Sequence, residues 1–156
     1  MISTNSAIYQ TEFGFFEISC SDDKIISIRR IDGIVHPDNS RRCKLTDDAF
    51  LQLQEYFQGK RKSFDLPLNP QGTEFQKKVW AELCNIPYSQ TRTYKEIAQA
   101  IGHPKAARAV GMANNRNPIP IIIPCHRVIG ASGSLIGYAY GVEMKKRLLD
   151  LESATA

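Results

Sequence analysis

Cys125, His126 and Arg127 stand in a row and could together carry out nucleophilic chemistry. They follow the apolar stretch at residues 120–124, and such a stretch predicts a buried segment. A cysteine acts as a nucleophile only as its thiolate, which requires a nearby base or positive charge. His126 could be that base, acting through a water molecule. Glu152 near the C-terminus could hold the imidazole, as the carboxylate of a catalytic triad does.

The same cysteine and histidine could instead be structural. Buried cysteines usually behave as small apolar side chains, and neighbouring side chains of a strand point to opposite faces. Burying ionisable groups is costly unless they are paired, so either interpretation requires partners for this cluster.

The composition is typical of a soluble globular protein of one or two domains. Of the 156 residues, 42% are hydrophobic and 23% are charged. No apolar run approaches the roughly 18 residues of a membrane span, and the first ten residues do not have the pattern of a secretory signal. The four cysteines have wide, irregular spacings. We therefore expect free thiols, a cytoplasmic location and no membrane association.

Positive charge is concentrated in the second half of the chain. Residues 1–70 contain nine Lys and Arg against ten Asp and Glu, whereas residues 71–156 contain eleven against six. The net charge of +4 therefore comes from the second half. We expect an anionic partner to bind there.

The first half predicts a β-hairpin followed by a helix. Two β-rich runs, residues 13–20 and 24–31, are separated by three turn-forming residues. Residues 46–59 carry apolar residues at helical spacing, with acids in the first turn and a glycine at the end. The Pro-rich residues 64–72 predict an extended linker, so we place the domain boundary near residue 70.

The second half predicts a helix-turn-helix. Residues 73–76 and 93–96 each have the sequence of a capping box, which marks the start of a helix. The second of these helices stops at Gly102, and Pro104 suits the first turn of a further helix over residues 105–115. Two short helices joined by a three-residue turn with a glycine have the form of a helix-turn-helix, although a generic helical hairpin gives the same pattern.

The remaining elements surround the reactive cluster. Residues 117–124 contain three prolines and cannot be helical. A hairpin-like segment rich in Gly and Ser follows at residues 130–141. Residues 142–152 predict a terminal helix whose packed side chains are Met144, Leu148 and Leu151.

The sequence "PCHRV" at residues 124–128 resembles the active-site signature of the O6-alkylguanine-DNA alkyltransferases, the methylated-DNA–protein-cysteine methyltransferases. The resemblance covers residues 72–152 with essentially no gaps, whereas the first half agrees only in the order of its elements. The motifs that carry it are residues 72–80, 93–130, 137–138 and 148–152.

This resemblance implies an α+β fold with two domains. Residues 1–70 would form a structural sheet-and-helix domain of the ribonuclease H-like type. Residues 71–156 would form a helical winged helix-turn-helix domain that binds DNA and carries the alkyltransferase site. The implied partner is double-stranded DNA that contains O6-alkylguanine, with O4-alkylthymine as a further candidate substrate. No cofactor is implied, and we expect a monomer that could cluster on DNA.

The resemblance also implies a mechanism and its residues. Cys125 is similar to the alkyl acceptor, His126 to its water-linked base, and Glu152 to the carboxylate that orients the histidine. Asn117 is similar to the hinge asparagine that ties the recognition helix to the active-site segment. Tyr94 is similar to the tyrosine that crowds a phosphate and assists proton transfer to the leaving guanine. Arg127 is better interpreted as structural. Because a thioether is a poor leaving group, each molecule would act once.

DNA binding would use the second helix of the helix-turn-helix. Arg108 is similar to the arginine that enters the base stack when the damaged nucleotide flips out. The other residues implied in DNA contacts are Tyr94, Lys105, Ala107, Ala109 and Arg116. The alkyl pocket implied by the resemblance comprises Pro120, Val128, Tyr138, Ala139 and Tyr140.

The chain departs from the family pattern at Tyr140. The family usually has glycine there, so a phenol ring would narrow the pocket. This departure concerns the width of the pocket and leaves the chemistry of Cys125 unchanged.

Other functions stay open on the sequence alone. A cysteine hydrolase would share the Cys–His–Glu arrangement, and a non-catalytic sensor of alkyl lesions would share the fold but replace Cys125. Cys20, His36 and Cys43 could be ligands of a metal ion, but their spacing fits no familiar zinc pattern. We therefore expect no metal.

Overall fold

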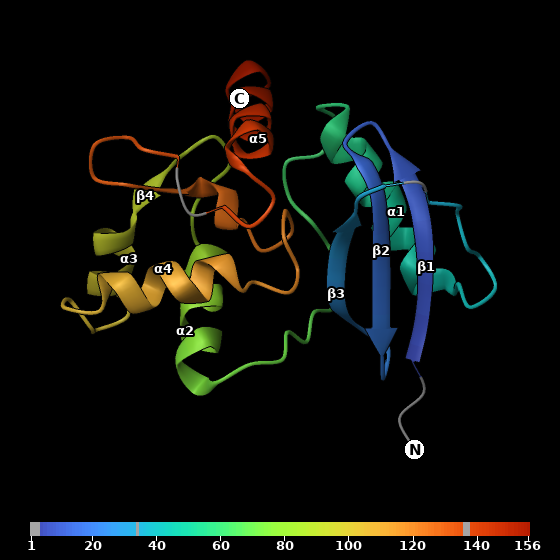
Figure 1. Ribbon diagram of the computed structural model, residues 1–156, viewed down its shortest axis with the longest axis horizontal. Coiled ribbons are helices and arrows are strands. Elements are labelled where there is room, and N and C mark those ends of the chain that lie inside the picture. The colour runs from blue at the N-terminus through green and yellow to red at the C-terminus, as the bar shows by residue number, and fades with distance from the viewer. Residues whose placement is uncertain (1–3, 34, 136–137) are drawn as a thin grey trace. The chain divides into compact units, whose positions relative to one another are not determined.

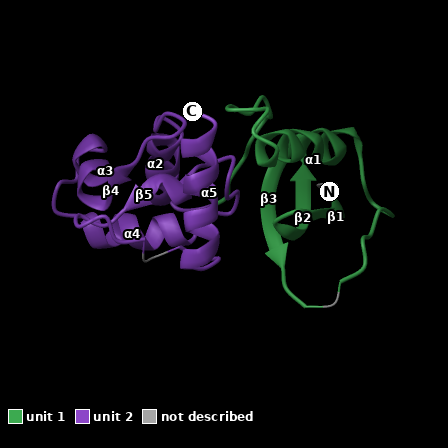
Figure 2. Ribbon diagram, turned by 90° about the horizontal axis from the view of Figure 1, so that it is seen from above, with its two compact units in different colours: residues 1–71 green, residues 72–156 purple. Residues whose placement is uncertain are grey.

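The computed structural model describes residues 4–33, 35–135 and 138–156. Its contacts group the chain into two compact units, residues 1–71 and 72–156, which Figure 2 draws in different colours. Each unit buries its own set of apolar side chains. In the described part of the chain, no helix combines the length and the apolar character that crossing a bilayer requires.

Unit 1 contains a three-stranded antiparallel sheet. Its strands lie in the order β1 (Thr4–Thr11), β2 (Gly14–Ser21) and β3 (Lys24–Ile31), side by side in Figure 1. The sequence pattern predicted the hairpin of β2 and β3 but missed β1. This strand is largely polar and buries only Ala7 and Tyr9, so it lacks a strong apolar alternation.

Helix α1 (Lys44–Phe57) packs against the sheet of unit 1. Its Phe57 stacks on Phe13 with ring centroids 4.4 Å apart. The helix begins two residues before the predicted stretch, and Gly59 lies just past its C-terminal cap, Gln58, as the sequence pattern predicted. The start is defined by a capping box formed by Cys43 and Thr46, which a search for Ser, Thr, Asp or Asn in the first position does not find.

Unit 2 is built around the helices α2 (Glu74–Leu83), α3 (Tyr94–Ala100) and α4 (Ala107–Asn115), which contact one another. The two capping boxes predicted for this half are confirmed at the starts of α2 and α3. The buried indole N–H of Trp80 donates to the carbonyl of Ala113 at 2.9 Å. This hydrogen bond ties α2 to the C-terminal part of α4.

The turn between α3 and α4 is longer than the three residues predicted. Gly102, with a φ of 81°, follows the end of α3, and the N–H of Ala106 donates to the carbonyl of His103 at 2.9 Å. This bond closes a β-turn with Pro104 in its second position. The prediction that Pro104 lies in the first turn of the next helix was therefore wrong, since α4 begins at Ala107. The fixed φ of proline suits both positions.

The remaining elements of unit 2 enclose the reactive segment. Strands β4 (Arg92–Thr93) and β5 (Val128–Ile129) form a short parallel pair that the sequence pattern did not predict. The terminal helix α5 (Val142–Ala154) confirms the predicted helix and extends it by two residues. The predicted hairpin-like segment at residues 130–141 includes residues 136–137, which lie outside the described residues.

Candidate active site

A buried, tightly turned segment at residues 117–123 leads into the reactive cluster. The side-chain amide of Asn117 donates to the carbonyl of Ile123 at 2.8 Å, and its oxygen accepts the N–H of Ile119 at 2.9 Å. Ile121 has a φ of 74°, a conformation that β-branched residues rarely adopt. Such a conformation persists only where the surrounding contacts impose it, so this turn is held by Asn117 and the core.

Cys125, His126 and Arg127 form one turn of 3-10 helix, η1 (Cys125–Arg127). Their exposed fractions are 4%, 0% and 6%. Because the segment is a helical turn, the strand geometry that would direct neighbouring side chains to opposite faces does not apply. The side-chain amide of Asn114, a residue that the sequence analysis missed, donates to the carbonyl of Cys125 at 3.3 Å.

Glu152 of α5 lies at the centre of a buried network of charges. Its carboxylate is 2.7 Å from Nε2 of His126 and accepts Nε and Nη2 of Arg127 at 2.9 and 3.0 Å. The backbone N–H of Ser89 donates to the same carboxylate at 3.0 Å. Arg127 also donates to the carbonyl of Ile86 at 2.8 Å. Arg127 therefore neutralises and orients Glu152 from inside the unit.

His126 is arranged to act as a base. Burial lowers its pKa below the ordinary value of 6.5, and the opposing effect of Glu152 does not compensate. The imidazole is therefore neutral at neutral pH. Since an ionised carboxylate only accepts hydrogen bonds, Nε2 carries the proton that points to Glu152, and Nδ1 is the basic nitrogen.

This depressed pKa predicts a loss of stability in mild acid. In the unfolded chain His126 binds a proton near pH 6.5, whereas in the folded protein it does so only at lower pH. The unfolded state therefore binds more protons as the pH falls below that value, and the free energy of unfolding decreases.

Chemical denaturation between about pH 7 and pH 5 measures the slope of the unfolding free energy against pH. His126→Gln should have a shallower slope, and the exposed His103→Gln should keep that of the wild type. Equal slopes for His126→Gln and wild type would contradict the prediction.

The Cys125 thiol is protonated in the resting protein. Burial raises its pKa to about 11, although a hydrogen bond from Asn117 and the charge of Lys145 act in the opposite direction. A nucleophilic role for Cys125 therefore requires that its proton be removed as the reaction proceeds. A neighbouring neutral imidazole is suited to accept it.

Lys145 of α5 is a second residue of the site that the sequence analysis missed. It is fully buried, its ammonium donates to the carbonyl of Val128, and it lies 5.9 Å from the centre of the Tyr94 ring. Burial lowers its pKa to about 8, and ionisation of Cys125 to the thiolate would raise it. The sequence does contain a signal. Lys145 precedes Glu152 by two helical turns, which places both on the buried face of α5.

Tyr94 can serve as a proton donor near the thiol. It is the first residue of α3, and its ring lies beside α4, where a Cβ atom built on Gly111 would meet it at 3.8 Å. Burial raises the pKa of the phenol, and a thiolate at Cys125 would raise it further. The phenol therefore keeps its proton at neutral pH.

Five of the six residues predicted to contact DNA lie on α4 or flank it, and the sixth, Tyr94, lies on α3. The opposite face of α4 packs Val110 and Ala113 into the core. A helix surface of small side chains lets its backbone approach a groove, and basic neighbours bind phosphates. The exposed or half-exposed members of the predicted set on this surface are Lys105, Ala107, Arg108, Ala109 and Arg116.

The predicted pocket residues differ in exposure. Pro120, Val128 and Tyr138 are buried, whereas Tyr140 is partly exposed and Ala139 is exposed. The rings of Tyr138 and Tyr140 meet edge to face with centroids 5.9 Å apart. The two tyrosines therefore form an aromatic pair before the start of α5.

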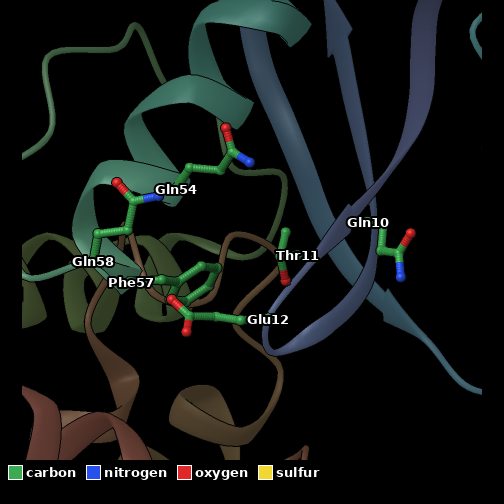
Figure 3. Close-up of a pocket in the computed structure, with 6 residues that line it drawn as sticks. All are labelled: Gln10, Thr11, Glu12, Gln54, Phe57 and Gln58. Atoms are coloured by element: carbon green, nitrogen blue, oxygen red, sulfur yellow. The ribbon is translucent and has the colours of Figure 1, made fainter.

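A cavity of about 450 Å³ in unit 1 has no cysteine or histidine in its lining. Figure 3 shows its lining residues, which come from α1 and the β1–β2 hairpin. Three of its six lining side chains are amides and one is a carboxylate, and none belongs to the reactive cluster of unit 2. They are Gln10, Thr11, Glu12, Gln54, Phe57 and Gln58.

Comparison with known proteins gives consistent matches over both units. Residues 74–154 match the DNA binding domain of the 6-O-methylguanine DNA methyltransferase family, and residues 6–70 match its ribonuclease-like domain. The methylated-DNA–protein-cysteine methyltransferase of Methanosarcina barkeri is 64% identical over 109 residues, which cover 70% of this chain and 69% of the relative.

Solved structures agree with these sequence matches. The crystal structure of Mycobacterium tuberculosis O6-methylguanine methyltransferase is similar with a TM-score of 0.87 and 41% identity, over 99% of this chain and 95% of that chain. The structure of Mycobacterium tuberculosis OGT in complex with DNA has a TM-score of 0.86 and 40% identity, over 98% and 94% of the two chains.

Proposed function

Because this chain belongs to the 6-O-methylguanine DNA methyltransferase family, we propose that Cys125 is the residue that accepts the alkyl group. The activity is direct reversal of DNA damage, in which an alkyl group moves from O6-alkylguanine in DNA to a cysteine of the protein itself. The observation that carries the assignment to Cys125 is its burial next to the paired His126 and Glu152.

The proposed reaction is a displacement at the alkyl carbon. The Cys125 proton passes to Nδ1 of His126 through a water molecule, and the sulfur attacks the carbon as its bond to O6 breaks. Tyr94 donates a proton to the departing guanine, which leaves as a neutral base. Lys145 stabilises the thiolate while it is charged, and Glu152 stabilises the imidazolium. The Tyr94 phenolate then regains a proton as the His126 imidazolium loses one, so the products are a thioether on Cys125 and an intact guanine.

The buried position of Cys125 requires that the damaged nucleotide leave the base stack. Enzymes that act on a base inside a duplex extrude it into a pocket. We assign the approach to DNA to α4, with Arg108 in the space that the base vacates and with Lys105 and Arg116 on phosphates. In this division of roles, residues 71–156 carry the reaction and residues 1–70 form the structural domain.

A duplex with radiolabelled O6-methylguanine tests the proposal. Label should move from DNA to protein and reach no more than one equivalent, because a thioether is a poor leaving group. Peptide mapping should find the methyl group on Cys125. Label on Cys20, Cys43 or Cys84, or repeated turnover, would overturn the assignment. We also infer a cytoplasmic location, since the reaction needs both DNA and a reduced thiol.

Replacement of Arg108 should separate base flipping from chemistry. Arg108→Ala should slow repair in duplex DNA by about 10- to 100-fold. Without the arginine the space left by the flipped nucleotide stays empty, and the free energy of unstacking, a few kcal/mol, is not offset. Reaction with the free modified base should change little, because no stack is opened. Rates on the two substrates, measured side by side, test this expectation. The control Arg116→Ala should only weaken DNA affinity, so its duplex repair should reach the wild-type rate at saturating DNA, whereas that of Arg108→Ala should stay slow. Equal losses on both substrates would exclude the proposed role of Arg108.

Tyr140 should limit the size of the alkyl group. A methyl group is small enough to pass the phenol, but a benzyl group needs a flat apolar space that Tyr140 would occupy. We therefore expect free O6-benzylguanine to inactivate the wild type slowly, and Tyr140→Gly to react about tenfold faster, a change that corresponds to ~1.4 kcal/mol of barrier. Repair of O6-methylguanine in duplex DNA should stay unchanged. Equal benzylguanine rates for the two proteins would show that the ring does not restrict the pocket.

A further inference from the structure

The thiols of Cys20 and Cys43 meet in unit 1, which contains none of the residues assigned to alkyl transfer. Their sulfur atoms are 3.4 Å apart, although the residues are 23 positions apart in the sequence. Cys20 lies on β2, on the face that packs its buried neighbours Phe16 and Ile18. Cys43 is the residue that precedes α1. Two rigid elements therefore hold the two thiols in contact.

The two thiols differ in pKa, so that one of them ionises more readily than the other. Burial raises the pKa of Cys20 to about 11, and its hydrogen bond with Cys43 adds to this effect. Burial also acts to raise the pKa of Cys43, but hydrogen bonds from the Thr46 backbone and from Cys20 outweigh it, so the pKa is lowered. Cys43 is thus the thiol that becomes a thiolate, and the start of α1 stabilises its charge.

Cys43 is also the thiol that small molecules can reach. It is half-buried, whereas Cys20 is 4% exposed. Both line a cavity of about 320 Å³ that Asn5, Asp22 and Leu45 also line. Thiolate character and access together determine which cysteines are oxidised first.

We propose that Cys20 and Cys43 form a redox-active dithiol, which a peroxide converts into a disulfide that joins β2 to the start of α1. The Cys43 thiolate attacks one peroxide oxygen, the O–O bond breaks, and a sulfenic acid forms as hydroxide leaves. Cys20 gives its proton to this hydroxide, which becomes water, and attacks the sulfenic sulfur. The S–O bond breaks as the S–S bond forms, and the second hydroxide takes up a proton from solvent, equal to the one that Cys43 released when it ionised. With hydrogen peroxide, two thiols lose two electrons, and the products are one disulfide and two water molecules.

Peptide mapping after mild oxidation tests this proposal independently of alkyl transfer. The full chain carrying Cys84→Ser and Cys125→Ala is treated with a small excess of hydrogen peroxide in the presence of a chelator, and the same mapping is done on the wild type. We expect the peptides of Cys20 and Cys43 to be linked, with a mass about 2 Da below their sum, and to separate again with a dithiol reductant. The melting temperature should rise by roughly 5–10 °C when the disulfide forms.

Single variants separate the roles of the two thiols. With Cys20→Ser, Cys43 should accumulate as a sulfenic acid that dimedone traps. With Cys43→Ser, Cys20 should stay reduced under the same treatment. The proposal is wrong if both thiols of the wild type stay reduced while Cys84 is oxidised. It is equally wrong if Cys43 is oxidised further to a sulfinic acid without linking to Cys20.

Discussion

Cys125→Ala should abolish alkyl transfer and keep the affinity for damaged DNA. Without the thiol no other group at the site can form the new bond to carbon, so transfer should fall by at least about 10³-fold. Affinity should change little, because it depends on phosphate contacts and on the flipped base, which the substitution does not touch. A filter assay for labelled protein and a gel-shift titration on the same duplex measure the two quantities.

The matched control is Cys84→Ala in the same unit. Cys84 is exposed, and we assign it no role in the reaction, so this variant should transfer label as the wild type does. If Cys125→Ala still took up methyl groups, or if Cys84→Ala lost them, the thiol assigned to the reaction would be the wrong one.

Replacement of Glu152 should be the most destabilising change in unit 2. Glu152→Ala removes the common partner of His126, Arg127 and the Ser89 N–H, all of which would be left inside the protein. Breaking a buried ion pair from one side typically costs about 3–5 kcal/mol of unfolding free energy, because the other charge stays buried. Urea denaturation at neutral pH measures this loss. The control Glu143→Ala, in the exposed first turn of α5, should cost less than about 0.5 kcal/mol.

Glu152→Gln distinguishes the catalytic effect from the structural one. The amide keeps the shape of the side chain but cannot balance a positive charge on His126. We expect transfer to slow by about 10²-fold or more at a temperature where the variant is fully folded, as general-base contributions are of this size. A Glu152→Gln variant that is folded and as fast as the wild type would show that Glu152 supports only the structure.

Local signals in the sequence predicted most of unit 2. Capping boxes at residues 73–76 and 93–96 locate two helix starts, since these depend on contacts within one turn. Prolines exclude a helix before the "PCHRV" sequence, because the missing N–H is a property of each proline itself. The family and its function followed from the same stretch of residues. The structure around Pro104 could not be predicted from the local sequence, because the fixed φ of proline suits a β-turn as well as a helix start.

The tertiary structure alone decided which charged groups are buried and what they meet. The sequence spacing places Lys145 on the same helix face as Glu152, but only the packing of α5 places it at the Tyr94 ring and near the Cys125 sulfur. Strand β1 was missed because it is largely polar, so that only its pairing with β2 identifies it as a strand. The sequence by itself determined the starts of α2, α3 and α5 and the residue types of the site. The pairing of Cys20 with Cys43 and the low pKa of His126 depend on burial and on distances across the chain, and only the packed chain specifies these.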